Sequence, residues 1–79
     1  MDKLIVVVEP NPKGHKKGYL IRLVLLAVDR SQKILSTIYS PTIKSAAKSV
    51  DALYDNLDCE IVDARNFIEN ETRQVVREN

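Results

Sequence analysis

Hydrophobic residues near the N-terminus form two runs, residues 4–8 and 19–28, and both are rich in Val, Ile and Leu, as strands are. Residues 10–18, between the runs, read Pro-Asn-Pro-Lys-Gly-His-Lys-Lys-Gly. Two prolines and two glycines cannot continue a strand, so the chain must turn here. The pattern predicts a hairpin of two strands, at residues 3–9 and 19–29.

A third strand is predicted at residues 33–39, after a polar connection at residues 29–32. The spacing of hydrophobic residues then changes to three and four, which indicates a helix over residues 41–57. We expect Ser40 to cap this helix and Pro41 to take its first position. Its hydrophobic positions are Ile43, Ala46, Ala47, Val50, Leu53, Tyr54 and Leu57.

Residues 59–62, Cys-Glu-Ile-Val, are short and β-prone. After a helix, such a segment is expected to lie parallel to an earlier strand through a right-handed crossover. Asp63 is expected to cap a second helix. The predicted fold is one α+β domain, residues 1–79, in the order β-β-β-α-β-α. Its mixed four-stranded sheet has the spatial order 3-2-1-4, with the first helix packed on one face.

The second predicted strand is hydrophobic on both faces, whereas a strand with one buried face should alternate hydrophobic and polar residues. Two interpretations remain possible: the C-terminal helix covers the second face of the sheet, or a partner covers it. Exposed hydrophobic patches usually mark interaction surfaces. The candidate interface residues are Leu20, Val24, Leu26 and Val28.

Net charge is +1, but its distribution is uneven. Residues 1–50 carry nine Lys and Arg against three Asp and Glu, whereas residues 51–79 carry three against eight. A dipolar chain can bind a polyanion, pair with itself or have two differently charged surfaces. Cys59 is the single cysteine, which fits a reducing compartment. No run approaches the about 18 hydrophobic residues of a membrane span, so we expect a soluble, cytoplasmic protein.

A basic cluster in the first loop is the candidate nucleic-acid site. It lacks the G-x-x-x-x-G-K-[ST] pattern of a phosphate loop, and it precedes a strand and not a helix. Its lysines can still contact a nucleic-acid backbone as point charges, in a salt-dependent manner without sequence specificity. The candidate residues are Lys13, His15, Lys16, Lys17 and Arg22.

Short motifs link the chain to the ribonuclease H-like fold. Asn-Pro at residues 11–12, followed by a turn into Gly18 and Tyr19, resembles the turn after the first strand of ribonucleases H, and residues 59–65 resemble their fourth strand, which ends in an Asp that opens a helix. The chain is also similar to HicB-type antitoxins and their single-domain relatives, which have a partial ribonuclease H-like fold. The shared features include Glu9, Gly18, Tyr19 and Thr42. The Pro-Asp-Leu-Pro-Gly segment usual in that family is absent.

If the chain is an enzyme, this resemblance implies a metal-dependent nuclease, with Glu9 and Asp63 as two of the carboxylates that bind the metal ions. Two-metal hydrolysis needs several converging carboxylates. The matching part of the helix holds Lys44 instead, and a lysine there would repel a cation. We therefore expect no catalysis, no metal and no cofactor.

Together these features predict a non-catalytic, HicB-like interaction module that binds and regulates a partner protein, as a homo-oligomer such as a homodimer. The alternative is a nucleic-acid-binding module that uses the basic loop.

Overall fold

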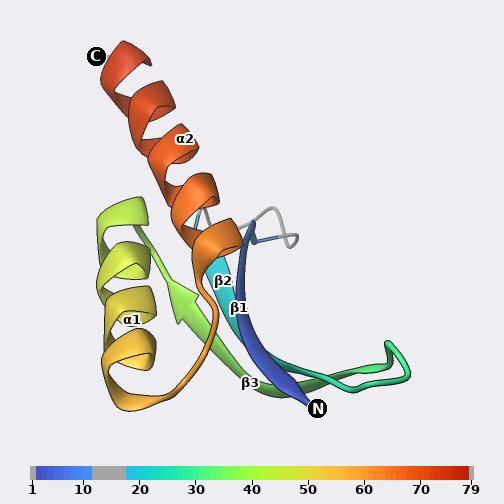
Figure 1. The fold of residues 1–79 in the computed structure, drawn as a ribbon. Coiled ribbons are helices and arrows are strands. Elements are labelled where there is room, and N and C mark those ends of the chain that lie inside the picture. The colour runs from blue at the N-terminus through green and yellow to red at the C-terminus, as the bar shows by residue number, and fades with distance from the viewer. Residues whose placement is uncertain (1, 12–17, 79) are drawn as a thin grey trace.

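A computed structural model describes residues 2–11 and 18–78 of the 79-residue chain. Three strands and two helices follow one another in the order β1 (Lys3–Pro10), β2 (Tyr19–Leu26), β3 (Gln32–Ser40), α1 (Ile43–Asn56) and α2 (Val62–Glu78) (Figure 1). The strands form one sheet in the order β1-β2-β3, and both neighbouring pairs are antiparallel. The predicted three-strand meander is therefore confirmed.

The predicted fourth strand is wrong, and with it the mixed sheet of order 3-2-1-4. The segment before α2 makes only an isolated parallel bridge between Glu60 and Ile5. In that bridge the Glu60 amide donates to the Leu4 carbonyl at 2.9 Å, and the Val6 amide donates to the Glu60 carbonyl at 2.9 Å. Because α2 begins at Val62, the segment is too short to extend this pairing into a strand.

The core lies between the sheet and the two helices, which both pack on one face (Figure 1). α1 contacts β2 and β3, whereas α2 contacts β1 and α1. Side chains alternate across a strand, so every second residue of β1 and β2 points into this core. The buried cluster consists of Val6, Val8, Ile21, Leu23, Ala46, Val50, Cys59, Ile61 and Ala64.

The turn between β2 and β3 begins earlier than predicted, because β2 ends at Leu26 and not at residue 29. Asp29 organises this turn: its Oδ1 accepts hydrogen bonds from the Ser31 hydroxyl at 2.6 Å and the Ser31 amide at 2.9 Å. These bonds favour the ionised carboxylate and lower the pKa of Asp29. Arg30 takes a positive φ of 70° to close the turn.

Thr42, and not Ser40, caps α1. The Thr42 hydroxyl oxygen accepts a hydrogen bond from the Ser45 amide at 3.1 Å, and the Thr42 amide donates to the Ser45 hydroxyl at 3.4 Å. This reciprocal capping box satisfies two backbone groups that the first helical turn leaves without partners. Ser40 instead ends β3 and is buried.

The start of α2 also differs from the prediction. The helix begins at Val62, so Asp63 lies inside its first turn and does not cap it. A carboxylate in that turn still interacts favourably with the helix dipole.

Within the described residues, no helix combines the length and the apolar character needed to cross a bilayer.

Candidate functional site

The face of the sheet turned away from the helices is covered by no helix or strand in the described part of the chain; we call it the open face. Cross-strand partners point to the same side of a sheet, so the strand register arranges this face in rows. From the β2–β3 turn towards the first loop, the rows are Lys3–Leu26–Gln32, Ile5–Val24–Ile34, Val7–Arg22–Thr37 and Glu9–Leu20–Tyr39.

The most hydrophobic row is Ile5–Val24–Ile34. Val24 is only 4% exposed, although none of the described helices covers it. It lies on the central strand, with Ile5 on one side and Ile34 on the other. Ile34 on the edge strand is 56% exposed. Leu35 is also exposed, and the register shift between β2 and β3 leaves it without a cross-strand partner in β2. The open face therefore has a hydrophobic centre that continues to its β3 edge.

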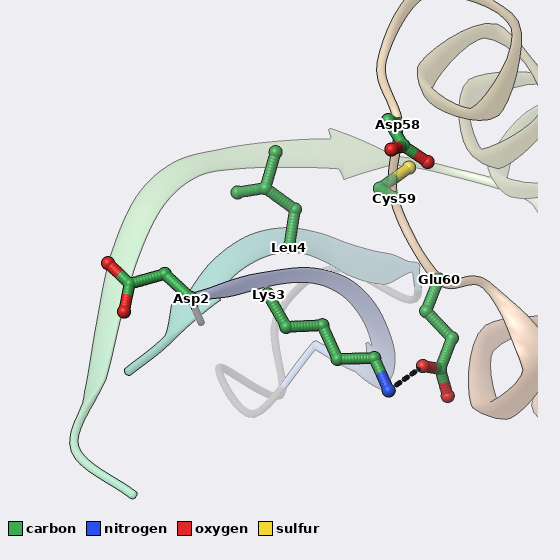
Figure 2. Close-up of a pocket in the computed structure, with 6 residues that line it drawn as sticks. All are labelled: Asp2, Lys3, Leu4, Asp58, Cys59 and Glu60. Carbon is green, nitrogen blue, oxygen red and sulfur yellow. Dashed lines mark ion pairs between the residues drawn. The ribbon is translucent and has the colours of Figure 1, made fainter. Parts of the chain in front are cut away.

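The charged residues of the open face are paired. The Arg22 guanidinium forms an ion pair with the Glu9 carboxylate, and both side chains are about one-third exposed. At the opposite end of β1, the Lys3 ammonium pairs with the Glu60 carboxylate (Figure 2). These pairs lie at the two ends of β1, so the hydrophobic row stands between them.

Of the four residues predicted as an interface, Leu20, Val24 and Leu26 lie on the open face. Val28 does not, because β2 has already ended; it is 71% exposed in the turn. The prediction missed Ile5, Val7 and Ile34, which the strand register brings beside the other three. The sequence indicated Ile5 and Val7 in part, since β1, like β2, is hydrophobic at successive positions.

The candidate nucleic-acid residues divide into two groups. Lys13, His15, Lys16 and Lys17 lie outside the described residues. Arg22 is described, and its charge is offset by Glu9. No observation on the described residues favours nucleic-acid binding, which stays a sequence-based prediction.

Glu9 and Asp63, the candidate carboxylates of a nuclease, do not come together. Glu9 points to the open face at the end of β1, whereas Asp63 belongs to α2 on the other side of the sheet. Among the described residues, no group of three or more His, Cys, Asp and Glu side chains is arranged to hold a metal ion.

A pocket of about 310 Å³ lies between the start of β1 and the segment before α2 (Figure 2). It is lined by Asp2, Lys3, Leu4, Asp58, Cys59 and Glu60. Burial raises the pKa of the Cys59 thiol, and the Asp58 carboxylate raises it further. Because the thiolate is the reactive form of cysteine, this environment makes Cys59 a poor nucleophile and a poor metal ligand.

Comparison of the chain with family models, with curated proteins and with solved structures gives no match. The resemblance to the ribonuclease H-like fold and to HicB-type antitoxins therefore stays a prediction.

Proposed function

We propose that this chain is a non-catalytic module that binds a partner protein through the open face and regulates it by occupying the partner's surface. One observation carries the proposal: the row Ile5–Val24–Ile34 is hydrophobic across all three strands and has no covering element among the described residues. Sheet faces of this kind are usually covered in small domains, and an uncovered hydrophobic face favours a protein contact.

The neighbouring charges support a protein partner over a nucleic acid. On the open face the Arg22 cation is paired with Glu9, and the Lys3 cation at its end is paired with Glu60. A nucleic-acid backbone is bound through cations that replace its counterions, and paired cations do this poorly. A hydrophobic centre with charge pairs around it is instead the usual anatomy of a protein interface.

The test compares two side chains of similar exposure on opposite sides of the molecule. Ile34 is 56% exposed on the open face, and Val62 is 59% exposed at the start of α2. A photo-reactive amino acid placed at each position, followed by mass spectrometry, identifies the protein that contacts each side. The protein captured through position 34 is then purified, and its affinity for the chain is measured by calorimetry.

We expect Ile34→Asp to weaken this binding at least about 10-fold, because a partly exposed Ile would lose roughly 1.4 kcal/mol or more of burial free energy. Val62→Asp serves as the matched control and should leave the affinity unchanged. Equal affinities for wild type and Ile34→Asp, or a loss confined to Val62→Asp, would overturn the proposal.

A further inference from the structure

The two edges of the sheet differ. The outer edge of β1 is engaged by Glu60, whose backbone bonds to Leu4 and Val6 and whose carboxylate pairs with Lys3. β3 has β2 as its only neighbouring strand in the described part of the chain. An edge strand presents a row of backbone donors and acceptors, which are a template for another strand.

β3 lacks most of the features that prevent edge pairing. Its nine residues include no proline, and its single charge, Lys33, lies at the second position. A register shift leaves Leu35 out of the pairing with β2, but residues 36–40 beyond it pair regularly with that strand. This uncharged segment can meet a second copy of itself without bringing like charges together.

We infer that two copies of this chain join through the outer edges of β3, antiparallel and about a two-fold axis normal to the sheet, into one six-stranded sheet. A register that excludes Leu35 places Ile38 opposite Ile38 of the second copy and Thr37 opposite its Tyr39. Ile38 points to the core side, whereas Thr37 and Tyr39 point to the open face. The register therefore matches core residue with core residue, and an aromatic with a β-branched residue, which is a favourable cross-strand pair.

The position of α1 is compatible with this arrangement. α1 packs over β2 and β3, so the two α1 helices would be separated by about two strand spacings, or ~10 Å, which is within the usual range for packed helices. Tyr54 marks the side of α1 that faces α2, because the Arg65 guanidinium lies 5.3 Å from its ring centre. The opposite flank carries short side chains, which permit close approach: Ser49, Ala52 and Asn56.

Surface area favours a second copy as the occupant of this edge. Two strands of eight residues and one of nine give the open face an area of roughly 400 Å², about half of the ~800 Å² that each partner of a stable complex usually buries. A two-fold axis normal to the sheet places both open faces on the same side and doubles this area. Support from the area of the open face rests on the proposed function, whereas the pairing of the β3 edges does not.

Sedimentation equilibrium of the full chain from 10 μM to 1 mM tests the dimer. We expect the wild-type chain to be a dimer and the variants Ser36→Lys and Ala52→Arg to be monomers. Ser36→Lys puts a charge into the paired segment, and Ala52→Arg puts a bulky side chain between the two α1 helices. Both positions are exposed and lie off the open face. Asn66→Arg, which adds the same charge to an exposed position of α2, is the control and should remain dimeric.

A distance measurement tests the register. In a Cys59→Ala background, nitroxide labels on Ser36→Cys would sit on Cα atoms about 14 Å apart, that is, four residues along the strand and one strand spacing across. Strong dipolar broadening is expected. A monomer at 1 mM, a dimer that survives both substitutions, or labels more than about 30 Å apart would overturn the inference, and none of these results bears on binding through Ile34.

Discussion

The hydroxyl of Tyr19 donates a hydrogen bond to the Glu71 carboxylate at 3.2 Å, across 52 positions of sequence. The Tyr19 ring also meets Phe67 edge-on, with ring centres 6.0 Å apart. Tyr19 begins β2, and both of its partners lie on α2. These contacts fix the long C-terminal helix to the end of the sheet from which the first loop leaves.

Tyr19→Phe removes this hydrogen bond and keeps the ring contact with Phe67. We expect the free energy of unfolding to fall by about 0.5–1.5 kcal/mol, the usual net contribution of one hydrogen bond. Urea denaturation followed by circular dichroism measures the change. Glu69→Gln is the control, because it breaks only the exposed pair with Arg73 on the same helix and should change stability by less than about 0.5 kcal/mol.

Gly18→Ala should destabilise the hairpin. A Cβ atom at this position would lie 2.7 Å from the Tyr39 hydroxyl and 2.9 Å from the Ser40 carbonyl oxygen. We expect a loss of about 1–3 kcal/mol, as for other overpacked sites. Adding Tyr39→Ala should give only partial rescue, because the Ser40 contact is with backbone. If Gly18→Ala is as stable as wild type, the start of β2 can shift enough to relieve these contacts, and the prediction is wrong.

Arg30→Gly should stabilise the chain. Arg30 has a φ of 70° in the β2–β3 turn, where glycine is free of the strain that a side chain causes. Relief of about 1–2 kcal/mol of strain exceeds the entropy that glycine loses on folding, so a net gain of about 0.5–1 kcal/mol is expected. Arg30→Ala removes the same charge but retains Cβ, and its thermal midpoint should not rise. A rise in both variants would assign the gain to charge.

Cys59 should make stability depend on pH in the alkaline range. Burial raises the pKa of its thiol in the folded chain, so the folded protein retains a proton that the unfolded chain loses above about pH 8.5. The stabilising contribution is present below that pH and is lost as pH rises through the folded pKa. Urea midpoints from pH 7 to 10 should therefore fall more steeply for wild type than for Cys59→Ala. Identical slopes would contradict the shift.

Elements with local signals were predicted well. The loop at residues 10–18 and the β-rich runs on either side define the first hairpin, and the three-and-four spacing of hydrophobic residues defines α1. The predicted ends of these elements were less accurate, because neighbouring residues can often serve equally well as the first or last residue of an element. Ser40 and Thr42 are both good capping residues, and the structure uses Thr42 because Ser40 remains paired with Tyr19 in the sheet.

The candidate interface was predicted in part for a similar reason. The double-sided hydrophobic pattern of β2 identified Leu20, Val24 and Leu26, since alternation within one strand is enough to place them on one face. Ile5 and Ile34 joined them only through cross-strand register, which depends on where both turns begin. Val28 was included because the hydrophobic run passes the last paired residue of β2.

By itself, the sequence determined the meander, the amphipathic first helix and the excess of hydrophobic residues on β2, because each is encoded by neighbours within one turn or one strand. The tertiary structure decided the path of the chain after α1. Cys59 and Ile61 both enter the core, α2 begins directly afterwards at Val62, and only Glu60 reaches β1. Both helices then pack on the same face. The open face is the consequence, and it depends on contacts between residues far apart in sequence, such as Lys3 and Glu60, which no local pattern encodes.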